Sequence, residues 1–253
     1  MDDKKGAPLY MYRHLIGGRS LVSACRLGVM TPGDMDEAVK LHDRVTRGLS
    51  PEIFVPTGPD DLARLVGGEG VSVGVWSEEK LICMRAVMTD ALWVNETLEK
   101  MGLPADETGR AVYTDHCIVD KEFRGNNVQF LTHYAIEYRI GDGCGVFFTT
   151  VSPKNTFSLA NILGCGFVVI GMKELYGGYM RYIMRKQLDR VMPIWTHGHL
   201  IIPLSDIEGQ KEAIADGLVG YKMIRKNRGH SMLYAPMAEH PPRGYWRNIA
   251  DGK

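Results

Sequence analysis

The stretch from Cys117 to Leu131 has the residue types and spacing of an anion-binding turn. Apolar residues at 111–119 predict a buried strand, and Arg124-Gly125-Asn126-Asn127 leads from it directly into a helix expected to reach about Ile140. The first N–H groups of a helix have no partner within it, and the helix dipole adds about half a positive charge there. Such a turn can hold a phosphate without a basic sequence, although an ordinary strand-to-helix connection has the same pattern.

Two side chains able to exchange a proton, Asp115 and His116, lie on the strand before this turn. Because side chains alternate along a strand, we expect only one of them to face a ligand. Histidine is the residue type whose ordinary pKa, about 6.5, lies nearest neutrality, and this favours His116 over Asp115 as a general base. A hydrogen-bonded structural role is the alternative for both residues.

Cysteine usage argues against disulfides and against a metal site. The chain has five cysteines, an odd number, and no C-x-x-C pair, so reduced thiols and no bound metal are expected. Cys117 is interpreted as a small buried residue rather than a nucleophile, because the sequence shows no ordered Cys-His-Asp arrangement.

Composition places the chain among ordinary globular proteins. It has 253 residues, of which 45% are hydrophobic, and 30 basic residues balance 30 acidic ones. Zero net charge gives no global field toward nucleic acid or an anionic membrane. No apolar run approaches the roughly 20 residues that a membrane helix needs, and no signal-like segment opens the chain. We therefore expect a cytoplasmic protein.

Hydrophobic periodicity predicts an α/β pattern over residues 21–188. The expected strands cover 21–27, 71–76, 80–88, 111–119, 145–151, 166–172 and 180–185, and the expected helices cover 34–47, 60–66, 95–101, 124–140 and 153–164. Residues 71–88 read as a hairpin.

Three parts are expected along the chain: an arm over 1–19, a main domain over 20–188 and an α/β extension over 189–253. In the extension we expect strands at 195–204, 219–226 and 232–235, a helix at 206–216 and a tail from Pro236 onward.

The turn at 124–129 resembles the acyl-CoA-binding motif of the GNAT superfamily of N-acetyltransferases. In that motif Arg or Gln is followed by two residues, Gly, one residue, and then Gly or Ala. Arg124 and Gly125 match the Arg-Gly that commonly opens it. Asn127 stands where glycine is expected, and asparagine adopts the left-handed backbone more readily than most residues. Gln129, at a Gly or Ala position, brings bulk or an extra donor beside the diphosphate.

A second match lies downstream and keeps the family's spacing. Asn155 and Ser158 begin a helix, and Gly166-Phe167 follows Asn155 by eleven and twelve residues. This is similar to the superfamily's Asn-x-x-Ala/Ser helix that ends in Gly-Phe. Both motifs, in this order among these strands, identify residues 21–188 as a member of the GNAT superfamily. The tyrosine that often serves as general acid is replaced by Ile162, which leaves Tyr176, Tyr179 or water for that role.

The resemblance implies a mixed sheet flanked by helices and splayed between the strands at 111–119 and 145–151, with the pantetheine arm in the gap. It implies that backbone groups of the first strand pair with pantetheine, that the amides at 124–129 hold the diphosphate, and that Asn155 bonds the arm. The expected acyl-CoA-binding residues are Cys117, Ile118, Val119, Arg124, Gly125, Asn126, Asn127, Val128, Gln129, Asn155 and Ser158.

The implied function is transfer of an acetyl or other short acyl group from acyl-CoA to a primary amine of a small molecule, directly within a ternary complex. An amine of lysine type has a pKa of about 10.4, so a base must remove a proton before attack. The sequence is also compatible with a homodimer, formed through the extension. The alternative is a non-catalytic acyl-CoA-binding or regulatory protein, which Ile162, Asn127 and Gln129 motivate. Neutral net charge argues against a third reading, an aminoacyl-tRNA-dependent transferase.

Overall fold

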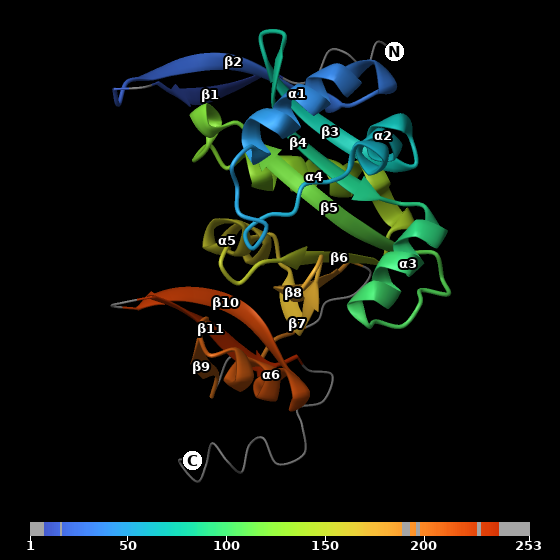
Figure 1. Ribbon diagram of the computed structural model, residues 1–253, viewed down its shortest axis with the longest axis vertical. Coiled ribbons are helices and arrows are strands. Elements are labelled where there is room, and N and C mark those ends of the chain that lie inside the picture. The colour runs from blue at the N-terminus through green and yellow to red at the C-terminus, as the bar shows by residue number, and fades with distance from the viewer. Residues whose placement is uncertain (1–7, 16, 189–192, 196–197, 227–228, 238–253) are drawn as a thin grey trace. The chain divides into compact units, whose positions relative to one another are not determined.

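The computed structural model describes residues 8–15, 17–188, 193–195, 198–226 and 229–237, and it divides the chain into two compact units (Figure 1). The first unit is Met1–Cys144 and the second is Gly145–Lys253. The predicted domain over 20–188 spans parts of both units. The predicted tail lies outside the described residues from residue 238 onward.

The first unit contains a sheet of five antiparallel strands in sequence order. The strands are β1 (Pro8–His14), β2 (Ser20–Val29), β3 (Gly70–Ser77), β4 (Lys80–Met88) and β5 (Ala111–Val119). The predicted hairpin is β3 and β4, closed where Ser77 pairs with Lys80. Strand β1 belongs to the arm, and all seven of its residues pair with β2.

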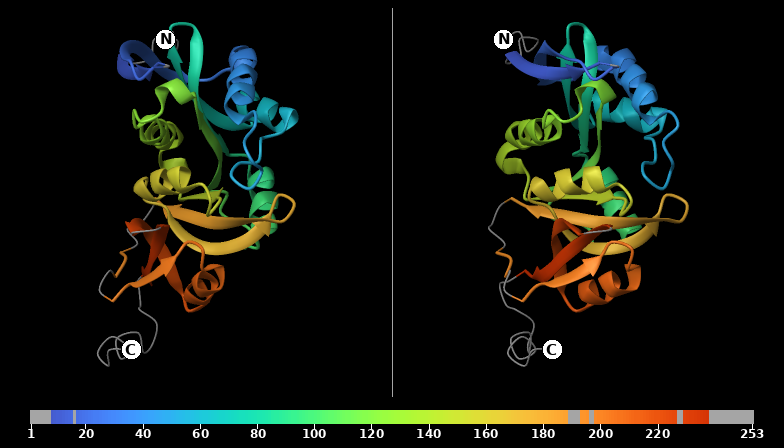
Figure 2. Two further views of the ribbon diagram at one scale, coloured as in Figure 1. Left: turned by 60° about the vertical axis from the view of Figure 1, so that its left-hand side comes forward. Right: turned by 90° about the vertical axis from the view of Figure 1, so that its left-hand side faces the viewer.

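Helices cover both faces of this sheet. Figure 2 shows α1 (Met35–Thr46) and α2 (Pro59–Gly67) on one face and α4 (Val128–Ile140) on the other. Helix α3 (Ala91–Met101) follows β4 and begins where the Asp90 carboxylate accepts a hydrogen bond from the backbone N–H of Trp93, at 2.9 Å. Short 3-10 turns precede α1 (Pro32–Asp34) and follow β5 and α4 (Lys121–Phe123, Gly141–Gly143).

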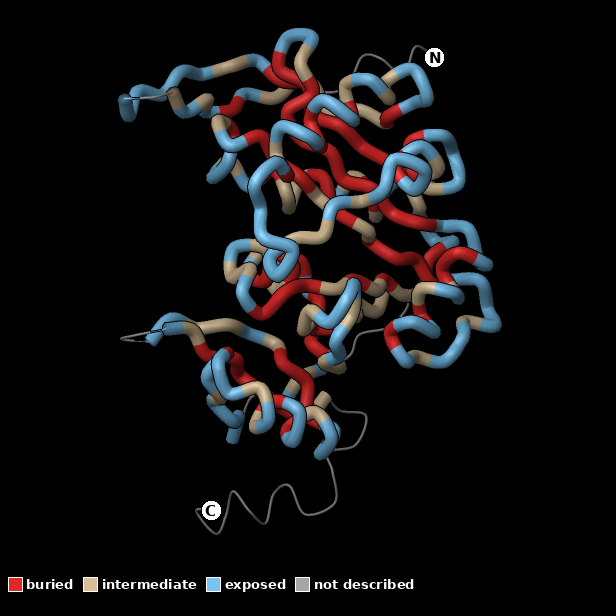
Figure 3. The backbone as a smooth tube through the Cα atoms, in the orientation of Figure 1, coloured by how far each residue is buried: buried red, intermediate tan, exposed pale blue. Residues whose placement is uncertain are grey.

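Strands β4 and β5 are buried on both faces, and this explains their nearly continuous apolar sequences. Met84 and Ile118 pack in the cluster that α1 and α2 contribute to. Their neighbours Cys83 and Val119 point the other way and pack against Val128 of α4. Figure 3 shows the burial concentrated along these strands.

A β-bulge interrupts the pairing of β4 with β5 at Asp115. Ala86 pairs with His116 and Val87 with Thr114, so Asp115 has no residue opposite it. Such an extra residue bends the strand and re-aims side chains that strict alternation would send to opposite faces.

The second unit contains an antiparallel sheet in the order β6-β8-β7-β10-β11-β9. The strands are β6 (Val146–Val151), β7 (Val168–Leu175), β8 (Tyr179–Gln187), β9 (Leu200–Pro203), β10 (Leu218–Lys226) and β11 (Gly229–Pro236), and the helices are α5 (Thr156–Gly164) and α6 (Ile207–Ala215). Gly220 joins β10 to β7, where a Cβ would lie only 3.1 Å from that of Val169. The buried Gln210 of α6 accepts hydrogen bonds from the Tyr182 and Tyr234 hydroxyls, at 2.6 and 3.0 Å.

Several predicted boundaries were wrong in this unit, and two of them have a local explanation or a clear extent. Helix α5 begins at Thr156 instead of Pro153, because the Asn155 side chain caps it and the preceding residues form a turn. The strand expected over 195–204 is confined to Leu200–Pro203. Residues 196 and 197 lie outside the described part of the chain.

Candidate functional site

The turn between β5 and α4 takes a left-handed course at two positions. Gly125 has a φ of 85° and Asn127 a φ of 55°. The left-handed conformation predicted for Asn127 is therefore confirmed, and helix α4 begins immediately after it, at Val128.

Six consecutive backbone N–H groups of this turn, from Arg124 to Gln129, have no hydrogen-bond partner among the described residues. Intramolecular bonding resumes at Phe130 and Leu131, whose N–H groups both donate to the carbonyl of Asn127, at 3.0 and 3.2 Å. Unpaired donors at the start of a 13-residue helix form a site for an anion. These are the amides that the sequence predicted for the diphosphate.

Side chains of the turn make contacts within the protein. Asn126 accepts a hydrogen bond from the backbone N–H of Tyr12, at 2.8 Å, and donates one to the carbonyl of Tyr12, at 2.7 Å. Arg13 of the same strand pairs with Glu122, at 2.8 Å. Arg124 donates to the carbonyl of Val119, at 3.3 Å. Strand β1 thus contacts the turn directly, which the sequence did not predict.

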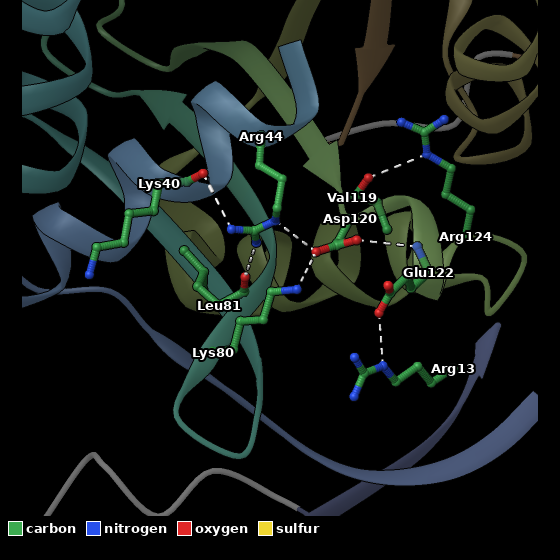
Figure 4. A network of polar contacts seen from close by, with 9 residues as sticks. All are labelled: Arg13, Lys40, Arg44, Lys80, Leu81, Val119, Asp120, Glu122 and Arg124. Carbon is green, nitrogen blue, oxygen red and sulfur yellow. Dashed lines mark hydrogen bonds and ion pairs between the residues drawn. The ribbon is translucent and has the colours of Figure 1, made fainter. Parts of the chain in front are cut away.

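A buried carboxylate, Asp120, fixes the entry to the turn (Figure 4). Its side chain is only 4% exposed and pairs with Arg44 of α1 and Lys80 of β4, each at 2.9 Å. It also accepts a hydrogen bond from the backbone N–H of Glu122, at 3.2 Å. Burial raises the pKa of Asp120, but the Lys80 ammonium, the Glu122 amide and the Arg44 guanidinium outweigh it and hold that pKa below its ordinary value.

Asp115 and His116 form a hydrogen-bonded dyad. The carboxylate Oδ2 lies 2.6 Å from Nδ1 of His116, and the Thr57 hydroxyl donates to the same Oδ2, at 2.7 Å. The expectation that strand alternation would separate these side chains was wrong, because the bulge at Asp115 turns both the same way. Burial alone would raise the pKa of Asp115. The hydrogen bond and charge of His116 and the hydrogen bond from the Thr57 hydroxyl outweigh burial, so that pKa lies below its ordinary value.

A second imidazole, His42 of α1, lies against the dyad. The His42 and His116 rings meet edge to face, with centroids 6.2 Å apart. Both Nε2 atoms are buried and have no partner in the part of the chain that the structure describes. Burial, and then the charge of His116, lowers the pKa of His42, so this imidazole is neutral near pH 7.

The remaining predicted residues of β5 divide between the two faces. Ile118 and Val119 are buried, and Cys117 is half-buried on the α4 face. Cys117 was predicted to be a small buried residue, and it is less buried than expected. Across the described ranges, no three His, Cys, Asp or Glu side chains converge as metal ligands.

Asn155 and Ser158 belong to the second unit, where they meet at the start of α5. The Asn155 carbonyl accepts a hydrogen bond from the N–H of Ser158, at 3.1 Å. Ile162 is buried in the same helix. The Tyr176 hydroxyl lies 3.0 Å from that of Thr150.

Three polar residues near the site were missed: His42, Thr57 and Arg85. Two of them carried a signal in the sequence. His42 lies beside Leu41 on the buried side of an amphipathic helix, and Arg85 interrupts the apolar run of β4. Thr57, in an irregular segment, carried none.

Comparisons with known proteins agree with the predicted fold. No family model matches the chain, and no curated protein matches it. Among solved structures, an acetyltransferase of the GNAT family from Streptococcus pneumoniae aligns with a TM-score of 0.50 and 15% identity, over 65% of this chain and 99% of that one. An N-acetyltransferase from Staphylococcus aureus aligns with a TM-score of 0.50 and 13% identity, over 66% and 99%. The chain has the GNAT acetyltransferase fold, and the predicted α/β class is confirmed.

Within the described ranges, the structure contains no helix that combines the length and apolar character needed to span a membrane.

Proposed function

We propose that the chain is an acyl-CoA-dependent N-acyltransferase that moves an acetyl or other short acyl group to a primary amine of a small molecule, directly within a ternary complex. The observation that carries this proposal is the row of six unpaired amides, Arg124 to Gln129, that follows β5 in a chain with an acetyltransferase fold. Amides in such a row match the oxygens of a diphosphate, which CoA carries.

The turn has room for such a ligand. A Cβ added at Gly125 would find no atom nearer than Nε2 of His14, at 4.0 Å, so the backbone there is open to a close approach. In this proposal the amides hold the diphosphate, and backbone groups of Cys117 to Val119 pair with pantetheine.

The dyad supplies the proton chemistry that an amine acceptor requires. A protonated amine cannot attack a thioester, because its lone pair is occupied. With Asp115 accepting the Nδ1 proton of His116, the ring presents an unpaired Nε2 that can take a proton from the amine. The carboxylate then stabilises the imidazolium, as in other histidine–carboxylate pairs. The amine attacks the carbonyl carbon, a backbone N–H near Val119 stabilises the oxyanion, and the CoA thiolate leaves.

One observation favours the alternative of a non-catalytic acyl-CoA-binding protein. Ile162, at the position of the family's usual proton donor, is buried in α5 and can donate no proton. The catalytic proposal therefore requires the departing thiolate to be protonated by Tyr176, by Tyr179 or by water.

Calorimetric titration with acetyl-CoA, longer acyl-CoAs and free CoA tests the proposal. We expect micromolar binding that discriminates among acyl groups, followed by CoA release when a panel of small primary amines is added. Failure of every CoA species to bind would overturn the proposal. Binding without CoA release across a broad panel would establish the non-catalytic alternative.

A further inference from the structure

A buried arginine without a carboxylate partner lies beneath the first turn of α4. Arg85 of β4 is 1% exposed, and it donates to the Thr132 hydroxyl at 3.3 Å and to the carbonyl of Gln129 at 3.0 Å. Its Nη1 is buried with no partner, and no acidic side chain among the described residues pairs with it. Burying a cation without a counter-charge destabilises the folded state by several kcal/mol. An anion beside Arg85 would offset this cost.

The thiol of Cys117 is a neighbouring group that can become an anion. Cys117 pairs directly with Arg85 across β4 and β5, so the two side chains lie on the same face of the sheet. Sγ of Cys117 lies 3.8 Å from Oγ1 of Thr132, the same hydroxyl that Arg85 contacts. The guanidinium and the thiol therefore share one polar partner in one buried site.

The other groups around this thiol favour its ionised form. The hydrogen bond from Cys83 lowers the pKa of Cys117, burial opposes it, and Arg85, Thr132 and His116 add to the lowering, which brings that pKa to about 6. The pKa of Cys83 is raised well above its ordinary value, so Cys83 stays a thiol that can donate. Helix α4, whose Thr132 contacts the thiol, also carries His133 and Glu137, which pair with each other at 2.7 Å.

Cys117 also differs from the other cysteines in exposure. It is half-buried, whereas Cys25, Cys83, Cys144 and Cys165 are buried. Reactive cysteines are those that combine partial exposure with a positively charged surrounding, and in this chain only Cys117 has both.

We propose that Cys117 is a thiolate paired with Arg85, and that it is the chain's site of covalent modification by small, uncharged electrophiles. Sγ attacks the electrophilic carbon, a carbon–sulfur bond forms, and the leaving group departs with the bonding electrons. No proton is released, because the thiol is already ionised. Charged reagents are disfavoured by the cost of partly removing them from water at this half-buried site. The proposal does not rest on the acyltransferase function.

Alkylation with iodoacetamide, from which iodide is displaced, tests the proposal on the folded full-length chain. Labelling at each cysteine is followed by peptide mass spectrometry between pH 5 and 9.5. We expect Cys117 to react first, with a rate that changes only about twofold between pH 6 and pH 9, whereas a thiol of ordinary pKa changes several hundredfold. The absolute rate at pH 7 is less informative, because nucleophilicity falls as the pKa falls.

Two variants separate the ion pair from other causes. Arg85→Met removes the cation and keeps most of the side-chain volume, and we expect a strong pH dependence of Cys117 labelling to return. Arg85→Lys keeps the charge and should keep the flat profile. If Arg85→Met fails to fold, Cys83→Ala, which removes the thiol donor, should steepen the profile instead. A wild-type profile that rises about tenfold per pH unit to pH 8, or first labelling at another cysteine, would overturn the proposal.

Discussion

The two faces of strand β5 treat a buried charge in opposite ways. On the face covered by α1 and α2, His116 has a carboxylate partner in Asp115, and its Nε2 has no partner among the described residues. On the face covered by α4, Arg85 has no carboxylate, and the counter-charge comes from the thiol of Cys117. The chemistry of a buried ionisable group therefore depends on its partner: a carboxylate partner favours a proton acceptor, and a thiol partner gives a nucleophilic anion.

The bulge at Asp115 creates this difference. In a regular strand, Asp115 would share the face of Cys117, where Arg85 lies. The bulge instead turns the carboxylate toward His116, at 2.6 Å. One extra residue therefore places the Asp115 carboxylate beside the imidazole of His116 instead of on the face of the Arg85 guanidinium.

The largest effect is expected from breaking the dyad. His116→Ala should lower kcat with an amine acceptor by about 10²–10⁴-fold near pH 7, because general base catalysis is worth about that much. The loss should shrink at high pH, where more of the amine is already neutral. Rates measured between pH 6.5 and 10 check this.

Two results would sharpen or contradict the assignment. Asp115→Asn, which no longer stabilises the imidazolium, should lower kcat less than His116→Ala does. A pH profile of His116→Ala identical to that of wild type would remove His116 as the base. Neither variant should change the affinity for acetyl-CoA.

The second-largest effect is expected in the turn between β5 and α4. Gly125→Val should weaken acetyl-CoA binding at least tenfold, because a β-branched residue cannot hold a φ of 85° and the amides would turn away. Titration calorimetry measures the affinity. Gly109→Val is a matched control, since Gly109 has a φ of 66° and lies outside the turn. Each substitution costs about 1–2 kcal/mol of strain, and equal loss of affinity in both would contradict the assignment of the turn.

A smaller effect is expected where β5 ends. Asp120→Asn should lower the free energy of unfolding by about 1–3 kcal/mol at pH 7, since it breaks a buried charge network whose cations are partly hydrated. The folded pKa of Asp120 is lowered, so its contribution is present above the unfolded pKa of about 3.9 and disappears as pH falls through the folded value.

Urea unfolding between pH 2.5 and 7 checks this prediction. The difference between wild type and Asp120→Asn should be largest near neutral pH and should shrink as the pH falls below the unfolded pKa of about 3.9. Asp142→Asn, at an exposed carboxylate, should change stability little at any pH. A difference that stays constant with pH would exclude the ion pairs as its cause.

The sequence predicted those features that short-range patterns determine. Strand β5 and the hairpin of β3 and β4 follow from apolar runs bounded by turn residues. The amide turn follows from one glycine and one asparagine placed between a strand and a helix. Even the error at α5 was local, because Asn155 caps the helix two residues after Pro153, where the sequence predicts its start.

The parts that could not be predicted depend on contacts between distant segments. Thr57 reaches the dyad from a loop between two helices, and Tyr12 meets Asn126 across 114 residues of sequence. The bulge depends on the pairing register of β4 with β5, and this register cannot be deduced from the residues of either strand alone. Arg85 was visible as a charge within an apolar run, but its lack of an acidic partner is a property of the fold.

The contact between Tyr12 and Asn126 has a practical consequence for anyone preparing this protein. Shortening the chain to residues 21–188, the region with the family motifs, would remove β1 and both hydrogen bonds between Asn126 and the backbone of Tyr12. A purified fragment beginning near residue 20 can then fold and still bind donor poorly, and an affinity tag placed close to residue 8 can disturb the same contact. A negative binding assay on a trimmed fragment therefore says little about the full chain.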